Sequence, residues 1–205
     1  MFAHFGPDGA DHCQGTFADR GECVAEPETV GSEATGPNRA GSASAGQCRP
    51  GSPRPKVIVE PDSLAQLDSL PTGSARSERT SLIAYATEVL ATRRLVHSYL
   101  DGGNATWIKP AVMADRLAAA GVEKMRGFAV GVASFDATDI SSTYGQQVAT
   151  ALSGLGVRGA RFVIDTSRNG NGAMDENGQH VDSCNPAGRR LGVPSSIGVG
   201  GAEYR

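Results

Sequence analysis

The sequence lacks the long apolar run that a membrane span requires. No stretch of about eighteen consecutive apolar residues occurs, which predicts that the chain has no transmembrane helix. The first residues, MFAHFGPDGADHC, contain neither a basic segment nor an apolar one, so we expect no signal peptide. The sequence alone leaves the localisation of the protein open.

Strong net charge is also absent. Lysine and arginine number 19 against 22 acidic residues, and the net charge is −3. Proteins that bind nucleic acids or anionic membrane surfaces carry an excess of basic charge, so we expect neither partner. Cysteine is scarce, and the four cysteines include no C-x-x-C pair, which predicts that the chain holds no zinc site.

The beginning of the chain has no periodic pattern of apolar residues. Residues 1–55 are rich in glycine, alanine, serine and proline, and such a segment cannot bury enough apolar surface to offset the entropy lost on ordering. We therefore leave residues 1–55 unassigned and predict that they are disordered, and we assign a folded domain to residues 56–205. Cys13, Cys23 and Cys48 lie in the first segment and Cys184 in the second, which leaves the disulfide state of Cys184 open.

Beyond residue 55, short apolar and β-branched runs alternate with segments of helical period. This alternation is typical of an α/β domain with parallel strands. One face of the helix expected at 75–94 carries five apolar residues, which predicts that this face packs on the core: Leu82, Tyr85, Ala86, Val89 and Leu90. The strands are expected at 56–60, 95–101, 126–135 and 160–166, and the other helices at 109–121 and 141–155.

Polar side chains gather where the expected strands end. The carboxyl ends of parallel strands meet at one edge of a sheet, and active sites of α/β domains lie at that edge. We therefore expect a single site there. Its candidates are Glu60 and Asp62 after the first strand, Asp101 after the second, Ser134 and Asp136 after the third, and Asp165 after the fourth.

One of these strand ends continues into a segment with the spacing of a calcium-binding loop. In DTSRNGNGAMDE, residues 165–176, Asp165, Ser167, Asn169 and Gly170 occupy the first, third, fifth and sixth positions of an EF-hand loop, and Glu176 occupies the twelfth. An EF-hand needs a helix on each side, whereas a strand is expected before this loop and no helical pattern follows it. We therefore predict a turn after a strand and no metal site.

Five segments near the expected strand ends resemble those of glycoside hydrolase family 6, the inverting β-1,4-glucanases and cellobiohydrolases. They are VIVEPDSLAQL (57–67), YLDGGNATW (99–107), RGFAVGVASF (126–135), FVIDTSRNGNG (162–172) and CNPAGRRLG (184–192). The resemblance covers about residues 56–204. It implies a distorted parallel (β/α) barrel, incomplete at both ends of the given sequence. It also implies a cleft that hydrolyses cellulose-like polysaccharide without a metal, a cofactor or an obligate protein partner.

The resemblance also implies roles for individual residues. Asp62 matches the aspartate of the family's Glu-Pro-Asp segment, which is the general acid, and Asp101 matches an aspartate that supports catalysis. Trp107 matches a tryptophan near the glucosyl rings, where an aromatic face packs on sugar C–H groups. Asn104 stands where the family usually has a histidine, and Ser134 where it usually has an asparagine, so both are expected to contact the substrate.

Three further residues are expected to have structural roles near the site. Glu60 opens the Glu-Pro-Asp segment that carries the expected acid. Asp165 and Arg168 are expected to form an ion pair that braces the loop after the fourth strand.

Two family segments have no counterpart in the given sequence. The aspartate of an Arg-Asp-Cys segment, whose charge helps to raise the pKa of the general acid, is not found in residues 1–55. The aspartate expected to act as the base follows a Trp-x-Lys segment that would lie beyond residue 205. The chain is therefore expected to be a weakly active or inactive O-glycosyl hydrolase of the endoglucanase or cellobiohydrolase class. A non-catalytic carbohydrate-binding protein stays open as the alternative.

Overall fold

The computed structural model describes residues 55–173 and 187–196. The disorder predicted for residues 1–55 falls, except for residue 55, outside the described residues, as do all four cysteines and Glu176 of the calcium-like segment. Within the described part, the chain forms four strands and three α-helices that alternate along the sequence.

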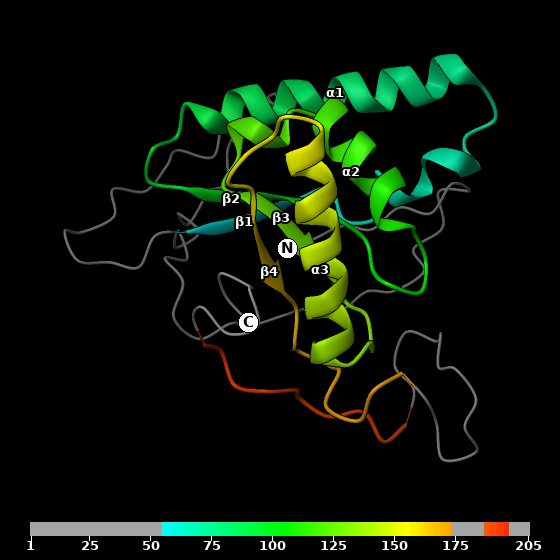
Figure 1. Ribbon diagram of the computed structural model, residues 1–205, viewed down its shortest axis with the longest axis vertical. Coiled ribbons are helices and arrows are strands. Elements are labelled where there is room, and N and C mark those ends of the chain that lie inside the picture. Colours follow the sequence, from blue (N-terminus) through cyan, green and yellow to red (C-terminus); the bar gives the residue numbers. More distant parts are fainter. Residues whose placement is uncertain (1–54, 174–186, 197–205) are drawn as a thin grey trace, which may run out of the picture.

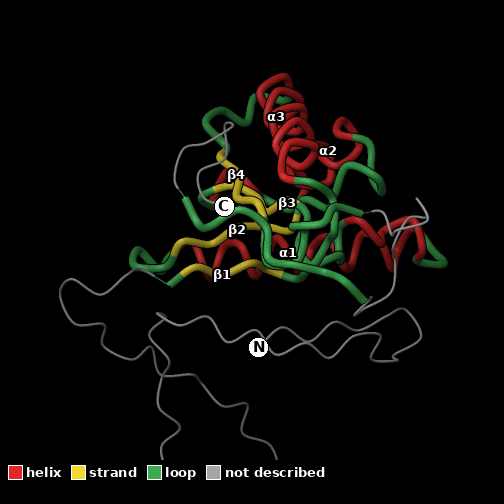
Figure 2. Tube along the Cα trace, turned by 90° about the horizontal axis from the view of Figure 1, so that it is seen from below, coloured by secondary structure: helices red, strands yellow, loops and turns green. Residues whose placement is uncertain are grey.

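The four strands form one parallel sheet in the order β1-β2-β3-β4 (Figures 1 and 2). They are β1 (Lys56–Val59), β2 (His97–Asp101), β3 (Gly127–Val130) and β4 (Arg161–Ile164). This arrangement confirms the predicted α/β class with parallel strands, and each strand lies within the range expected from the sequence. Every strand ends at the same edge of the sheet because all four run in the same direction.

Helices connect successive strands and pack beside one another (Figure 1). They are α1 (Gly73–Ala91), α2 (Pro110–Ala119) and α3 (Thr138–Gly154), and α2 contacts both of the others. Local signals explain two of the starts: Thr72 Oγ1 accepts a hydrogen bond from Ala75 N at 3.1 Å, and Pro110 occupies the first turn of α2. Short 3₁₀ turns occur at Ala65–Ser69 and Val122–Lys124.

The core lies between the sheet and these helices. One row across the sheet consists of Val59, Leu100, Phe128 and Phe162, all of which are buried, and the rings of the two phenylalanines stack with centroids 5.7 Å apart. The helices contribute residues that are buried completely or nearly so: Ile83 of α1, Met113 and Leu117 of α2, and Val148 and Leu152 of α3. Burial of this apolar surface holds the strand ends in fixed relative positions.

The prediction for the buried face of α1 is wrong in part: Ala86 and Leu90 pack against the core as expected, but the other three residues do not. Leu82 and Tyr85 are 63% and 67% exposed and Val89 is 40% exposed, whereas Ile83 and Thr87 are buried. The reason is that the hydroxyl of Thr87 lies 2.7 Å from the carbonyl oxygen of Ile83 and 2.8 Å from that of Ala120, so the buried hydroxyl always has an acceptor. None of the helices among the described residues is long and apolar enough to cross a membrane.

Candidate active site at the carboxyl ends of the strands

The loops that leave the four strands are joined to one another by hydrogen bonds. The backbone N–H of Asp62, after β1, donates to Asp101 Oδ2 at the end of β2, with 2.8 Å between the atoms. Gly102 N donates to Ala129 O at 2.7 Å, and Gly131 N donates to Gly103 O at 2.8 Å. The structure therefore brings together the strand ends at which the sequence placed the candidate residues.

The turn that carries Asp62 has an unusual backbone. Glu60 and Asp62 have φ angles of 47° and 67°, in the left-handed region, which costs a non-glycine residue about 1–2 kcal/mol. Ser63 ties the turn together because its backbone N–H and its hydroxyl both donate to Glu60 O, at 3.2 and 2.8 Å. The bond from Asp62 N to Asp101 offsets part of the cost, and strained backbone of this kind is common in active sites.

Asp101 is a strongly perturbed carboxyl group at this edge. It is only 2% exposed, and burial raises its pKa to about 7, with the negative charge of Asp62 as the second cause. The backbone N–H of Asp62 acts in the opposite direction because it stabilises the carboxylate. Near neutral pH, Asp101 is therefore poised between its neutral and charged forms, and its charge state affects Asp62.

This perturbation predicts a specific dependence of stability on pH. Between the ordinary pKa of 3.8 and the folded value of about 7, the unfolded chain releases the proton of Asp101 while the folded protein retains it. The free energy of unfolding should therefore fall as the pH rises from 4 to 7, by roughly 2–4 kcal/mol from this group. Urea unfolding at several pH values measures the slope.

Asp101→Asn is the matched variant for this measurement. The amide keeps an oxygen that can accept from Asp62 N but cannot titrate, so the fall in stability between pH 4 and 7 should become smaller. Asp115→Asn removes an exposed carboxyl group from α2 and should keep the wild-type slope. Equal slopes for wild type and Asp101→Asn would show that Asp101 does not titrate in this range.

The loop after β2 presents Trp107 to solvent. Trp107 is 45% exposed, while the next residue, Ile108, is only 7% exposed and anchors the loop in the core. Asn104 Oδ1 accepts hydrogen bonds from Thr106 N at 3.2 Å and from Thr106 Oγ1 at 2.9 Å. The oxygen of Asn104 is thus used within the loop, so contact with a ligand would fall to its amide nitrogen.

The loops after β3 and β4 are also connected. Asp165 Oδ2 accepts a hydrogen bond from Ala133 N and Asp165 Oδ1 accepts one from Ser167 N, each at 2.8 Å. Ser134 Oγ accepts a hydrogen bond from Asp136 N at 3.1 Å. Ser134, a residue expected to contact substrate, therefore lies within a loop that Asp165 holds from the neighbouring strand.

Arg168 packs on the ring of Phe135, a contact that was not predicted from the sequence. Its guanidinium group lies 4.1 Å from the centroid of the Phe135 ring, a cation–π contact. Burial lowers the pKa of Arg168, and the negative charge of Asp165 opposes this change. Asp165 thus attracts the guanidinium of Arg168, while the ion pair expected between the two side chains stays a prediction. The ring contact is an additional restraint on the loop.

Asn169 was recognised in the sequence only as part of the calcium-like spacing. It is 4% exposed, and its side-chain nitrogen donates to Asp136 O at 3.0 Å and lies 3.2 Å from Thr138 Oγ1. Asn169 therefore ties the loop after β4 to the loop after β3 and to the start of α3. No sequence signal marked this bond, because its partner is a backbone carbonyl.

The calcium-like segment follows strand β4, whereas an EF-hand loop follows a helix, and the absence of a calcium site stays a prediction. Both carboxylate oxygens of Asp165 accept backbone N–H groups, and a strand precedes the loop. In the ranges 55–173 and 187–196, there is no group of three or more His, Cys, Asp or Glu side chains that could hold a metal ion.

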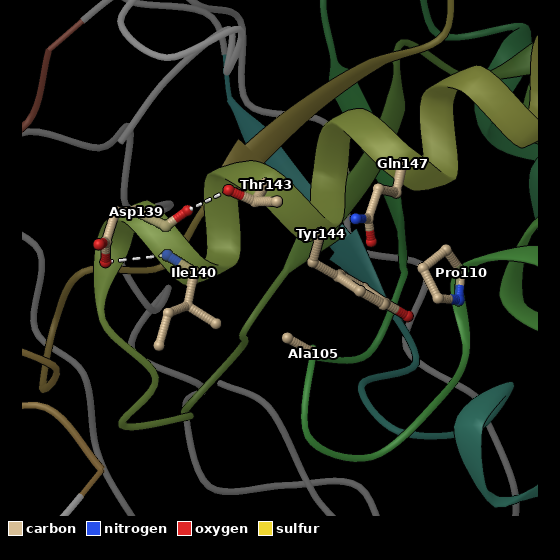
Figure 3. A pocket seen from close by; sticks show the side chains of 7 residues that line it. All are labelled: Ala105, Pro110, Asp139, Ile140, Thr143, Tyr144 and Gln147. Atoms are coloured by element: carbon tan, nitrogen blue, oxygen red, sulfur yellow. Dashed lines mark hydrogen bonds between the residues drawn. The ribbon is translucent and has the colours of Figure 1, made fainter.

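Two shallow hollows flank the first turn of α3. One, of about 280 Å³, lies between α3 and the loop that leads into α2, and Figure 3 shows Tyr144 and Pro110 on its two sides. Tyr144 donates a hydrogen bond to Gly102 O at 3.1 Å, and burial raises the pKa of its hydroxyl. Tyr144 thus fixes the loop after β2 to α3. The other hollow, of about 480 Å³, lies between the start of α3 and residues 191–193.

Comparison with known proteins extends these observations. Residues 51–204 match the family model described as glycosyl hydrolases family 6. The chain is 41% identical over 138 residues to Endoglucanase A of Cellulomonas fimi, covering 67% of this chain and 27% of that protein. It is 38% identical over 149 residues to Endoglucanase 1 of Streptomyces halstedii, covering 72% of this chain and 44% of that protein.

A solved structure shows the same similarity in three dimensions. The endoglucanase Cel6 from Mycobacterium tuberculosis, in complex with methyl-cellobiosyl-4-deoxy-4-thio-β-D-cellobioside, matches with a TM-score of 0.63 and 36% sequence identity. The match covers 73% of this chain and 49% of that one. The chain therefore spans about half the length of this relative, and 27% and 44% of the two endoglucanases.

Proposed function

Because the chain belongs to glycosyl hydrolase family 6, we propose that it acts on β-1,4-glucan by hydrolysis with inversion, and that Asp62 is the general acid. We further propose that its four parallel strands are part of a distorted (β/α) barrel with the glucan cleft at their carboxyl ends. The comparisons support the family and a structural match to its catalytic domains over about half of their length.

The proposed reaction requires two carboxyl groups. Asp62 gives its proton to the glycosidic oxygen as the bond from that oxygen to the anomeric carbon breaks, and water attacks the carbon from the opposite face. A second carboxylate, about 6.5–9.5 Å from the acid in inverting enzymes, takes the proton of the water. The family resemblance assigns this base to a segment that follows Trp-x-Lys, which the given sequence does not include.

One observation carries the assignment of Asp62. The backbone of this residue is held in a left-handed conformation by the buried Asp101, at the edge of the sheet where the Trp107 loop also begins. Two adjacent carboxylates repel each other, so the contact between Asp62 and Asp101 favours a state in which one of the two carboxyl groups carries a proton. Asp101 is also a poor candidate for the base, because it is buried and bonded to the backbone of the acid.

The proposal predicts that the full chain binds cello-oligosaccharide through Trp107. Replacing Trp107 with alanine removes an exposed aromatic face, and we expect the affinity for cellohexaose to fall about tenfold. Isothermal titration calorimetry measures the change. Tyr85→Ala is the control, because Tyr85 is an exposed aromatic residue on α1, away from the strand ends, and its loss should leave the affinity unchanged.

The alternative function is carbohydrate binding without catalysis, which the exposed Trp107 also favours. The two functions differ in their dependence on Asp62. A hydrolase releases reducing sugar that depends on the Asp62 carboxyl, whereas a binding protein holds cellohexaose with no such release. Failure of the wild-type chain to bind cellohexaose would contradict both functions.

A further inference from the structure

Two carboxylates in this structure make the same kind of contact with a neighbouring loop. Asp101 accepts the backbone N–H of Asp62, whose φ is 67°, and Asp165 accepts the backbone N–H of Ala133, whose φ is 55°. In both cases a strand-end aspartate binds a left-handed residue that is not glycine. The first contact belongs to the expected acid, while the second lies on the other half of the sheet edge.

The backbone of Ala133 is strained, so its left-handed conformation needs a stabilising interaction. Alanine adopts a left-handed backbone only at an energetic cost, and its methyl side chain cannot make a hydrogen bond that compensates. Asp165 supplies the bond, and its own position is fixed because its second oxygen accepts Ser167 N and its backbone N–H donates to Val130 O at 3.1 Å. The conformation of residue 133 thus depends on a carboxylate from the next strand.

The residue that this conformation positions is Ser134. Its backbone N–H donates to Gly131 O at 2.9 Å, and its Oγ accepts Asp136 N at 3.1 Å. The hydroxyl oxygen is therefore oriented from within the loop, and its single proton is directed away from these bonds. A half-buried hydroxyl held in this way can donate to a hydroxyl oxygen of a bound sugar.

The far end of the same loop is held by the same neighbour. Asn169 donates its side-chain N–H to Asp136 O, and Arg168 packs on the ring of Phe135. Residues 165–169 therefore restrain residues 133–136 at both ends. The segment with calcium-like spacing therefore has a structural role, the restraint of the neighbouring loop, that requires no metal.

We propose that Asp165 is a positioning residue: it holds Ala133 in the left-handed conformation and thereby sets the Ser134 hydroxyl to donate to a hydroxyl group of the glucan. The inference rests on the proposed function for the identity of the ligand. It goes beyond that function by assigning to Asp165 the control of the substrate contact that Ser134 is expected to make.

Asp165→Asn is the primary test in the full chain. Both oxygens of Asp165 accept backbone N–H groups, so an amide of the same shape can keep only one of the two bonds. We expect the affinity for cellohexaose, measured by titration calorimetry, to fall about tenfold, and Ser134→Ala to cause a similar fall. In the Ser134→Ala background, Asp165→Asn should then cause no further loss, because the two residues act through the same contact.

Ala133→Gly provides a rescue that a general loss of stability would not give. Glycine adopts a positive φ without strain, so Ala133→Gly in the Asp165→Asn background should recover most of the lost affinity. Ala137→Gly is the control, because Ala137 has an ordinary φ of −56°, and it should give no recovery. Thermal melts of each variant verify that the protein tested is folded.

The outcomes separate this inference from the function on which it rests. If the wild-type chain binds cellohexaose and Asp165→Asn binds it equally well, this inference is overturned while the proposed function stands. The same holds if the losses of affinity from Asp165→Asn and Ser134→Ala add in the double variant. Absence of rescue by Ala133→Gly would also overturn it. If the wild-type chain does not bind cellohexaose, the proposed function fails, and this inference fails with it.

Discussion

Replacing Asp62 with asparagine is expected to lower the weak release of reducing sugar from carboxymethylcellulose to the level of a protein-free blank, because loss of a general acid costs about 10²–10⁴-fold in rate. Asparagine keeps the shape of the side chain and tolerates the left-handed backbone at this position better than most residues, so the variant should fold. What it lacks is the proton that the leaving oxygen requires. A reducing-sugar assay with the purified full chain measures the loss.

Asp115→Asn is the control for this prediction. It removes an exposed carboxyl group from α2 without touching the strand ends, and its release of sugar should equal that of the wild type. Release by Asp62→Asn that matches the wild type would show that another group protonates the leaving oxygen. The wild-type signal is expected to be weak because the given sequence does not include the expected base, so long incubations are needed.

Gly127→Ala is expected to destabilise the fold by on the order of 4 kcal/mol or more, a large part of the stability of an ordinary domain. Gly127 pairs with Arg161 in the sheet and has a φ of 151°. A Cβ atom built there would lie 1.7 Å from the carbonyl oxygen of Arg161 and 2.8 Å from its backbone nitrogen. Since the obstacle is backbone, the clash can be relieved only by separating β3 from β4.

Gly154→Ala is the matched control for this variant. Gly154 is the last residue of α3, and no atom lies within 4 Å of a Cβ built on it. Alanine there should leave the stability unchanged or raise it by up to about 1 kcal/mol, because glycine is the weaker helix former. Urea unfolding followed by circular dichroism compares the two variants. Equal midpoints for Gly127→Ala and the wild type would contradict the described pairing of β3 with β4.

The order of strands and helices could be predicted from the sequence because each depends on local patterns. The apolar runs around Ile58, Phe128 and Phe162 are too short for helices and are bounded by polar residues or glycine, and strongly periodic segments separate them. The buried face of α1 could not be predicted in the same way. Thr87 counts as polar in any pattern of hydropathy, and only the nearby carbonyl oxygens make its burial possible.

The candidate site could be located but not assembled from the sequence. That Asp62, Asp101 and Asp165 follow strands is a local fact, and parallel strands bring such residues to one edge. The bonds that these residues make depend on the folded chain. The pKa of Asp101 is raised because surrounding loops bury it, and the left-handed conformation of Ala133 has no signature in the residue type.

The segment DTSRNGNG illustrates how one pattern can serve two purposes. Its spacing of oxygen-bearing side chains matches a calcium loop, yet Asp165 binds backbone N–H groups and Asn169 donates to a carbonyl. Side chains that could ligate a cation instead satisfy the backbone of the neighbouring loop. The spacing of residues in the sequence shows which polar side-chain atoms could bind a cation. The fold determines which atoms they contact.

The assignment of Asp62 as the general acid is tested most directly by comparing the effect of Asp62→Asn on two substrates. Carboxymethylcellulose has a sugar leaving group that needs a proton, whereas 2,4-dinitrophenyl β-cellobioside releases a stable phenolate that needs none. If Asp62 is the general acid, the variant should lose about 10²-fold or more on the polysaccharide and less than about tenfold on the aryl glycoside. An equal loss on both substrates, or no loss on the polysaccharide, would contradict the assignment of Asp62.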